Sequence, residues 1–205
     1  MRAKRSPDLI QVFLVVLLSA VLAPQRLWSS PFLYRISKTY TTLEFTVTKW
    51  MVFKEQGLFQ DFQGQLSYDP QHPERSRVEV TVQASSIDTR EQGRDEVLRS
   101  DDFFDVEKYP TLSFQSTSAV AKAPDALDVT GDLTIHGTTH RITIPVKVLG
   151  VREMPNIGSF VGFETSFTID RRDYGVLGSR WSGGKLAIDN TVYIHLILGG
   201  VKGQG

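Results

Sequence analysis

The stretch RVEVTVQ, Arg77 to Gln83, shows the pattern on which the fold class depends, because apolar and polar residues alternate along its whole length. Val78, Val80 and Val82 share one side of the alternation, and charged or polar residues take the other side. Successive side chains of a β-strand point to opposite faces, so a period of two predicts a strand with one buried face.

The same alternation recurs on both sides of this stretch. Further strand-like runs occupy residues 42–48, 57–68, 111–120, 126–136, 141–148, 160–169 and 191–198. Turn-forming sequences rich in Pro, Gly, Asn and Asp separate the runs, as at Pro155-Asn156-Ile157-Gly158. Such short connections predict antiparallel neighbours, and about eight strands result.

One short helix is expected among the strands. Residues 91–100 follow Asp88 and Thr89, and either of these two residues suits the N-cap, while Val97 and Leu98 would face inward. Pro145 lies inside a strand-like run, so we expect a sheet edge, a bulge or a missing ladder bond at that point.

The expected fold class is all-β, with eight antiparallel strands and one short helix. A closed up-and-down barrel and a two-layer sandwich both fit, and the alternation alone does not choose between them. A single apolar face runs through every strand. In an eight-stranded barrel this face either fills the interior or surrounds one small ligand, and plain core is the commoner case.

The first thirty residues differ from the rest of the chain. Arg2, Lys4 and Arg5 precede an almost unbroken apolar run of about fifteen residues, Leu9 to Ala23, which is typical of a secretory signal and short for a membrane-spanning helix. We therefore expect a signal peptide or N-terminal anchor at residues 1–30 and a functional domain at residues 34–200. The expected localisation is periplasmic or extracellular, with membrane anchoring through residues 9–23 as the alternative.

Composition argues against several classes of function. Lys and Arg together number 23, as do Asp and Glu, so no net charge attracts the chain to nucleic acid. The chain has no cysteine, which excludes disulfides, thiolate catalysis and Cys-ligated metals. It also lacks the Gly-x-Ser-x-Gly elbow of a Ser-His-Asp hydrolase. We expect neither a catalytic site nor a cofactor.

Two polar clusters remain as candidates for chemistry. His136 and His140 flank a turn and could approach each other across a hairpin, but a metal site needs a third ligand that the sequence does not supply. Asp170-Arg171-Arg172-Asp173 is either a salt-bridged turn or, through Arg171 or Arg172, a contact to the polar head of a ligand. An enzyme that uses His136 or the Arg171–Asp173 loop is the least favoured alternative.

Four segments carry a resemblance to a known family. They are GLFQDFQGQLSYDP (57–70), SSIDTREQGRDEVLRSDDFFDVEKYPTLSF (85–114), GDLTIHGTTHRITIPV (131–146) and FTIDRRDYGV (167–176). In this order they resemble the YceI-like family of lipocalin-like, polyisoprenoid-binding, exported proteins. The chain departs from the family pattern at WMVFKEQ (50–56), where the family has a shorter link, and at residues 180–184.

The resemblance implies an eight-stranded antiparallel up-and-down barrel whose apolar lumen holds an isoprenoid or quinone-type lipid. Its role would be storage or transport outside the cytoplasm, with transient membrane contact and with the oligomeric state left open. The alternative is a structural or stress-protective barrel without a ligand. The residues expected to line the lumen are Phe45, Val47, Phe59, Val80, Val82, Phe114, Leu133, Ile135, Ile144, Val146, Phe163, Phe167, Ile194 and Leu196.

The stretch RSDDFFDVEKYPTLSF, Arg99 to Phe114, is expected to join the helix to the sheet. Phe103 or Phe104 would close the lumen, because adjacent residues do not face the same way. The acidic residues of this stretch are expected to cap backbone N–H groups rather than to act as acid–base catalysts.

Overall fold

The alternating runs form one antiparallel sheet in the computed structural model, which describes residues 32–180 and 188–202. The strands are β1 (Phe32–Ile36), β2 (Thr42–Lys49), β3 (Phe53–Phe59), β4 (Phe62–Tyr68), β5 (Arg77–Gln83), β6 (Ile87–Asp88), β7 (Thr111–Ala123), β8 (Ala126–Ile135), β9 (Thr138–Met154), β10 (Gly158–Asp170) and β11 (Ile188–Lys202). The helical elements are α2 (Gln92–Arg99) and the 3₁₀ turns η1 (Lys38–Tyr40), η2 (Pro73–Arg75), η3 (Ala84–Ser86) and η4 (Arg171–Tyr174).

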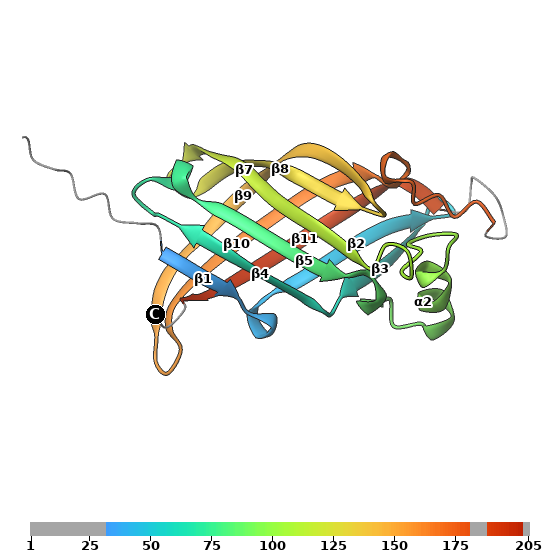
Figure 1. Ribbon diagram of the computed structural model, residues 1–205, viewed down its shortest axis with the longest axis horizontal. Helices are drawn as coiled ribbons and strands as arrows, with labels where there is room; N and C mark the ends of the chain where they lie inside the picture. The colour runs from blue at the N-terminus through green and yellow to red at the C-terminus, as the bar shows by residue number, and fades with distance from the viewer. Residues whose placement is uncertain (1–31, 181–187, 203–205) are drawn as a thin grey trace, which may run out of the picture. The chain divides into compact units, whose positions relative to one another are not determined.

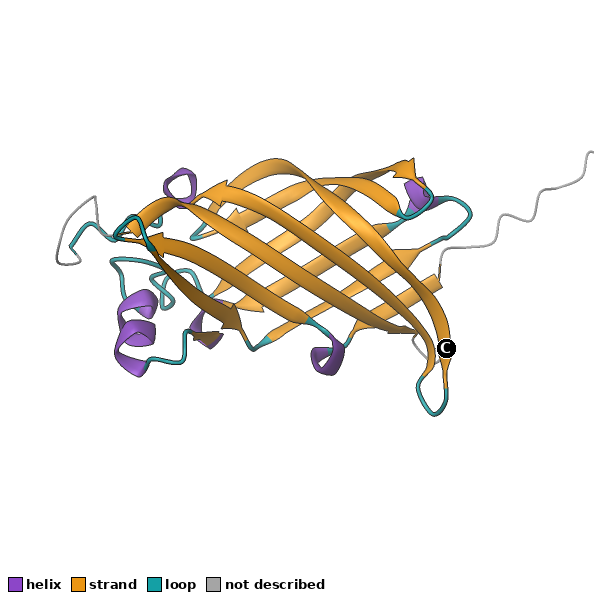
Figure 2. Cartoon of the chain, turned by 180° about the vertical axis from the view of Figure 1, so that it is seen from behind, coloured by secondary structure: helices purple, strands orange, loops and turns teal. Residues whose placement is uncertain are grey.

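The sheet closes on itself as a barrel. β1, β4, β5, β7, β8, β9, β10 and β11 are hydrogen-bonded in this order, and β11 pairs back to β1 with Lys202 opposite Tyr34. β2, β3 and β6 continue the barrel wall beyond β1, β4 and β5, respectively. In this part of the wall β2 pairs with β11, β3 with β2, and β6 with β3. This pairing makes an up-and-down barrel of eight strand positions and confirms the predicted barrel over the sandwich. Figures 1 and 2 show the barrel from two opposite sides.

Three neighbouring strand positions of the barrel wall, namely β1 with β2, β4 with β3, and β5 with β6, are each interrupted by a bend. η1 separates β1 from β2, residues 60–61 separate β3 from β4, and η3 separates β5 from β6. The interruptions touch, since Gln60 N–H donates to the Ser86 carbonyl at 3.2 Å and Lys38 Nζ lies 2.5 Å from Asp61 Oδ1. We call residues 37–41, 60–61 and 84–86 the bend line. The prediction of one strand at residues 57–68 was wrong, because the chain turns at this line.

The helix α2 forms where the sequence predicts it, but its cap differs. Glu91 is the N-cap, and its carboxylate accepts hydrogen bonds from Gly93 N–H at 3.0 Å and Arg94 N–H at 2.7 Å. Neither Asp88 nor Thr89 takes this place, so that prediction was wrong. A carboxylate at the N-cap satisfies the free N–H groups of the first turn and also meets the positive end of the helix dipole.

β9 and β10 are longer than the alternation suggested, and they meet at the predicted turn. The turn lies between Met154 and Gly158, where Asn156 has a positive φ of 65°. The ladder between β9 and β10 ends at Val146, one residue from Pro145, which lacks the N–H that a ladder needs. The carbonyl of Pro145 instead accepts the Thr165 hydroxyl at 2.6 Å.

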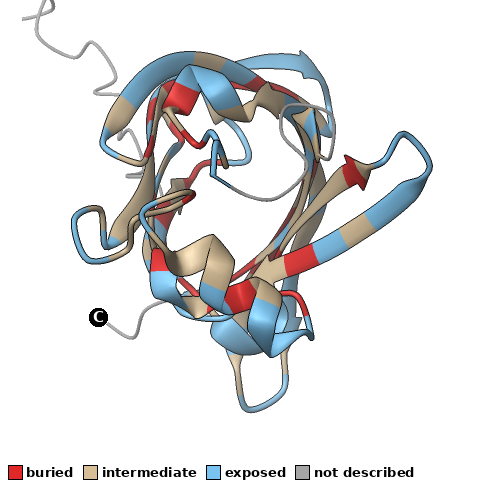
Figure 3. Cartoon of the chain, turned by 90° about the vertical axis from the view of Figure 1, so that its right-hand side faces the viewer, coloured by how far each residue is buried: buried red, intermediate tan, exposed pale blue. Residues whose placement is uncertain are grey.

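The two ends of the barrel are built differently, and we name them the β1 end and the α2 end. At the β1 end Tyr34 and Val161 are almost fully buried. Tyr68 on β4 and Phe163 on β10 meet edge to face with ring centroids 5.2 Å apart, although their strands are not neighbours in the sheet. Side chains therefore fill the interior at the β1 end. Figure 3 looks onto the α2 end, where α2 lies at the rim of the strand wall.

The segment expected to be a signal peptide or anchor, residues 1–30, lies outside the described residues. Within the described ranges, no helix is long and apolar enough to cross a membrane.

Candidate functional site

A cavity of about 510 Å³ occupies the barrel, and its wall extends from Tyr68 and Phe163 at the β1 end to α2. Small-molecule sites in proteins are typically about 300–1,000 Å³ and are walled mainly by apolar side chains. All fourteen residues expected to face the lumen lie in its wall: Phe45, Val47, Phe59, Val80, Val82, Phe114, Leu133, Ile135, Ile144, Val146, Phe163, Phe167, Ile194 and Leu196. Each of the eight strand positions contributes residues to the cavity wall. At the position that β1 and β2 share, these residues belong to β2.

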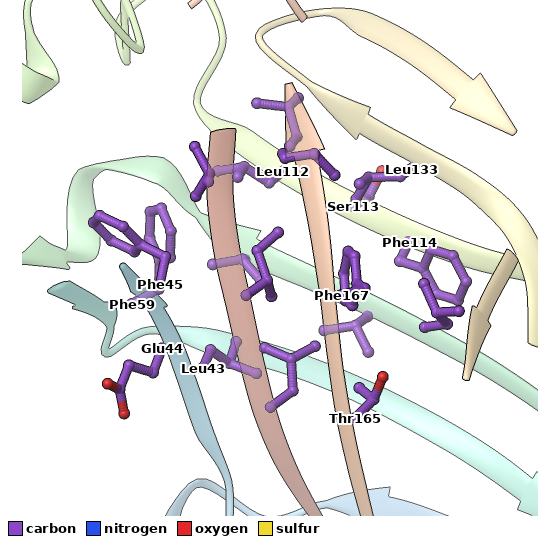
Figure 4. Close-up of a pocket in the computed structure, with 18 of the residues that line it drawn as sticks. Leu43, Glu44, Phe45, Phe59, Leu112, Ser113, Phe114, Leu133, Thr165 and Phe167 are labelled. Carbon is purple, nitrogen blue, oxygen red and sulfur yellow. The ribbon is translucent and has the colours of Figure 1, made fainter. Parts of the chain in front are cut away.

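Aromatic rings form one side of the cavity near the α2 end. The rings of Phe45 and Phe59 lie side by side in Figure 4 with centroids 5.8 Å apart, and Phe104 meets Phe59 edge to face at 5.9 Å. Gly57 makes room for this arrangement, because a Cβ at that position would lie 2.4 Å from Cζ of Phe45. The same figure shows the Glu44 carboxylate pointing away from the labelled apolar side chains.

Several polar groups of the cavity wall have partners within the wall. The Ser116 hydroxyl accepts a hydrogen bond from Val78 N–H at 2.8 Å, and the Thr165 hydroxyl donates to Pro145, so neither is left unsatisfied. Burial raises the pKa of the Tyr68 hydroxyl, and the nearby Tyr34 and Asp69 raise it further. Tyr68 is therefore a neutral hydroxyl at physiological pH.

Four of the charged residues of the wall lie close together at the α2 end. Glu55 on β3 contacts Arg94 on α2, and Lys49 Nζ lies 3.8 Å from the other oxygen of Glu55. Arg94 Nε is also 3.9 Å from Glu91. We call Lys49, Glu55, Glu91 and Arg94 the charged rim. The charged rim was not predicted from the sequence, although the period of two, extended back from Phe59 and Gly57, places Glu55 on the inward face.

Phe103 and Phe104 both line the cavity at this end. Phe103 is buried and packs with Ile135, Tyr174 and Val176, whereas Phe104 is partly buried and faces Phe59. The loop after η4 is fixed over Phe103, because Gly178 N–H donates to the Asp102 carbonyl at 2.8 Å. Gly178 has a φ of +61°, and a Cβ there would lie 2.4 Å from the Phe103 ring. Glycine is therefore required for this packing.

The two arginines expected as head-group contacts take different places. Arg171 lies in the cavity wall, and its guanidinium donates to the carbonyls of Val176, Leu177, Ile188 and Asp189 and to the Asn190 side chain at 2.6–3.4 Å. These contacts occupy every N–H of its fork. Arg171 therefore ties the loop after η4 to the start of β11.

Arg172 is exposed and is not in the cavity wall. Its Nη2 lies 2.6 Å from Asp170 Oδ2, and Gly175 ends the turn with a φ of +75°. The structure thus contains the salt-bridged turn that was the alternative to head-group contact.

The two histidines of the β8–β9 hairpin each contact a different aromatic ring. His136 lies in the turn with a φ of +50°, and its ring is 4.2 Å from that of Tyr109. His140 meets Tyr174 at 5.0 Å, and its Nε2 is 3.0 Å from the Asp173 carbonyl oxygen. Neither histidine lines the cavity. Over residues 32–180 and 188–202, no group of three or more His, Asp or Glu side chains is arranged to hold a metal ion.

Comparison with known proteins gives a consistent result in sequence and in structure. The model of the YceI-like domain matches residues 34–198. A UPF0312 protein of Pseudomonas aeruginosa strain LESB58 is 37% identical over 145 residues, which cover 70% of this chain and 75% of that protein.

Two solved structures have the same barrel. The crystal structure of BcnA from Burkholderia cenocepacia has a TM-score of 0.73 at 22% identity and covers 80% of this chain and 98% of that chain. A polyisoprenoid binding domain from Saccharophagus degradans, implicated in plant cell wall breakdown, has a TM-score of 0.66 at 18% identity and covers 83% and 98%. At these identities the two structures establish a shared fold.

Proposed function

The chain belongs to the YceI-like family, and from this premise we propose that its barrel holds the apolar chain of an isoprenoid lipid, such as the tail of a quinone. The observation that carries the proposal is the cavity of about 510 Å³, whose wall is apolar between the filled β1 end and the charged rim. A polyisoprenoid binding domain with the same fold is a further support.

The driving force for this binding is burial of apolar surface. Each Å² of apolar surface removed from water contributes about 25 cal/mol, so an extended hydrocarbon chain binds without a polar anchor along its length. Branched, unsaturated chains suit a wall of Phe, Val, Ile and Leu side chains, because these pack by shape rather than by hydrogen bonding. Width and depth of the cavity would then select among lipids.

We place the polar head of the lipid at the α2 end. The charged rim offers both cationic and anionic groups there, and all four of its members lie in the cavity wall. At the β1 end, Tyr68 and Phe163 meet across the interior, and both rings also belong to the cavity wall. A lipid would therefore enter tail first from the α2 end.

We further propose that the protein stores or carries this lipid outside the cytoplasm. The support is the sequence pattern of residues 1–30, in which basic residues precede an apolar run, as in secretory signals and N-terminal anchors.

A matched pair of substitutions on β11 tests lipid binding. Leu196 lines the cavity, whereas its neighbour Ile197 is 38% exposed and points to the opposite face of the strand. Leu196→Trp fills the middle of the cavity and should lower uptake of an added polyprenol or ubiquinone at least about tenfold, which is the effect of losing about 1.4 kcal/mol of binding free energy. Ile197→Trp should leave uptake unchanged.

Uptake is measured by native mass spectrometry of the purified protein after incubation with the lipid. Thermal unfolding of both variants shows whether the barrel is intact. Equal uptake by Leu196→Trp, Ile197→Trp and the unchanged chain would place the lipid outside the cavity. The proposal also fails if the unchanged chain carries no lipid and takes up none.

A further inference from the structure

The turn between β2 and β3 exposes four consecutive large apolar side chains. Their exposed fractions are 56% for Trp50, 91% for Met51, 71% for Val52 and 57% for Phe53. We call Trp50–Phe53 the hairpin tip. Single exposed apolar residues are common on soluble proteins, but a contiguous apolar group at a projecting turn is typical of an interaction site.

The backbone conformation of the hairpin tip is one that other residue types adopt more easily than Trp and Met do. Trp50 and Met51 have positive φ values of 48° and 64°, and Val52 N–H donates to the Lys49 carbonyl at 3.3 Å. Turns with positive φ at both central residues are formed most easily by Asn-Gly or Gly-Gly. A large side chain at each position is strained, and such strain in folded proteins clusters at functional sites. The hairpin tip therefore has a composition that folding alone does not explain.

Cationic and aromatic groups surround the base of the hairpin tip. Lys49 Nζ lies 4.5 Å from the centre of the Trp50 ring, and Lys54 Nζ lies 5.1 Å from that of Tyr193, which is itself 49% exposed. Exposed apolar side chains, aromatic rings and ammonium groups thus lie together at this turn. This combination matches a phospholipid surface, where acyl chains lie below an interface that favours Trp and Tyr, and lysines reach the phosphates.

The hairpin tip stands beside the entrance of the cavity. Lys49 and Glu55, which flank it in the sequence, belong to the charged rim and line the cavity. β2 and β3 meet at the same end of the barrel as α2 (Figure 1). A surface that covers the hairpin tip would thus also face the opening through which we propose that lipid enters.

We propose that the hairpin tip is a membrane-docking element, which inserts its apolar side chains into a phospholipid bilayer and holds the α2 end against it. A bilayer suits this shape better than a protein does, because a protein interface of standard size buries about 800 Å² on each partner and a four-residue turn presents only a small, convex surface. Docking itself needs no ligand in the cavity. Its use for lipid transfer rests on the proposed function.

Site-specific fluorescence tests the insertion, since the chain has no native cysteine. Met51→Cys places an environment-sensitive NBD label on the hairpin tip. Val120→Cys is the matched control, because Val120 is 53% exposed on β7 near the β7–β8 turn, at the β1 end. With vesicles of phosphatidylcholine and phosphatidylglycerol, the label at position 51 should shift its emission to the blue and be quenched by nitroxide-labelled lipid. The label at position 120 should do neither.

This readout is local, so vesicle binding through residues 9–23 does not produce it. Absence of a shift at position 51, or equal shifts at both positions, overturns the proposal. A shift that occurs without vesicles and grows with protein concentration overturns it as well, because a second copy of the chain would then cover the hairpin tip.

Two further variants separate docking from folding. Val52→Asp should lower vesicle affinity about tenfold, whereas Val120→Asp should leave it unchanged. The double variant Trp50→Asn with Met51→Gly should unfold at the same or a higher temperature than the unchanged chain, because it relieves the turn, and should still lose vesicle binding. Full vesicle affinity in either tip variant, measured by the quenching of an NBD label at Phe53→Cys, overturns the proposal.

Lipid uptake distinguishes failure of docking from failure of the proposed function. Val52→Asp should take up polyprenol normally from a detergent-free dispersion and should extract it more slowly from vesicles. If the unchanged chain takes up no lipid but its label at position 51 still inserts, the proposed function falls and the docking element stands. If uptake is normal but position 51 does not insert, only the docking element falls.

Discussion

The β1 end and the α2 end of the barrel use the same alternating strands for different purposes. At the β1 end, side chains from strands that are not neighbours meet across the interior, as Tyr68 and Phe163 do, and Tyr34 and Val161 are almost fully buried. At the α2 end the wall is completed by α2 and by Phe103 and Phe104, and a cavity remains. Alternation therefore determines which way a side chain points, whereas the packing across the barrel determines whether that side chain forms core or lines the cavity.

The first prediction concerns stability, where the two ends should differ most. Tyr34→Ala removes a side chain that is 1% exposed and leaves an empty space, so we expect a loss of about 3–5 kcal/mol in the free energy of unfolding. Phe45→Ala at the α2 end should cost about half as much, because one side of that ring faces the cavity and has fewer contacts to lose. Guanidinium unfolding of both variants measures this. An equal loss of unfolding free energy in the two variants would show that Phe45 is packed as tightly as Tyr34 and that the two ends do not differ in packing.

The second prediction concerns the brace of the α2 end. Arg171→Lys keeps the positive charge but loses the planar fork that joins the loop after η4 to β11. We expect a loss of about 1.5–3 kcal/mol in the free energy of unfolding, as for hydrogen bonds to a charged group. Arg172→Lys is the control. Because Arg172 forms an exposed ion pair with Asp170, this substitution should lower the free energy of unfolding by at most about 1 kcal/mol. A similar cost for both variants would show that the fork of Arg171 does not brace this end.

The third and smallest effect is a pH dependence at the β1 end. Burial of the Asp69 carboxylate opposes ionisation, but hydrogen bonds from the Gln71 and His72 N–H groups and the His72 imidazole outweigh it, so the pKa of Asp69 is lowered from 3.8. A lowered folded-state pKa contributes stability above the unfolded-state pKa, and this stability is lost as the pH falls through the folded-state value.

Asp69→Asn should therefore reduce stability at neutral pH and should flatten the decline in the free energy of unfolding below about pH 4. Urea unfolding at pH 6 and pH 3 measures how far the free energy of unfolding declines in the unchanged chain and in the variant. An equal decline in both proteins would show that groups other than Asp69 cause the acid sensitivity.

Much of the site could be predicted from the sequence because a period of two is a local property. Each strand shows its inward face through its own residues, so the fourteen wall positions could be identified without knowing the partners of the strands. The turn at Pro155–Gly158 and the place of α2 are local in the same sense.

Other features could not be predicted because they depend on distant contacts. At the bend of residues 60–61, Asp61 pairs with Lys38 and Gln60 N–H donates to the Ser86 carbonyl, and both partners lie far away in the sequence. Arg171 is one of two adjacent arginines, and only the positions of the loop after η4 and of β11 distinguish it from Arg172. The charged rim likewise joins a strand to a helix nearly forty residues later, in the contact of Glu55 with Arg94.

The bend line has a mechanical consequence. It interrupts three adjacent positions of the wall, so β2, β3 and β6 form a panel that remains attached to the rest of the sheet chiefly along β11. The panel also carries the hairpin tip, which joins β2 to β3. A force applied to the hairpin tip therefore reaches the rest of the sheet through the ladder between β2 and β11 and through the three segments of the bend line.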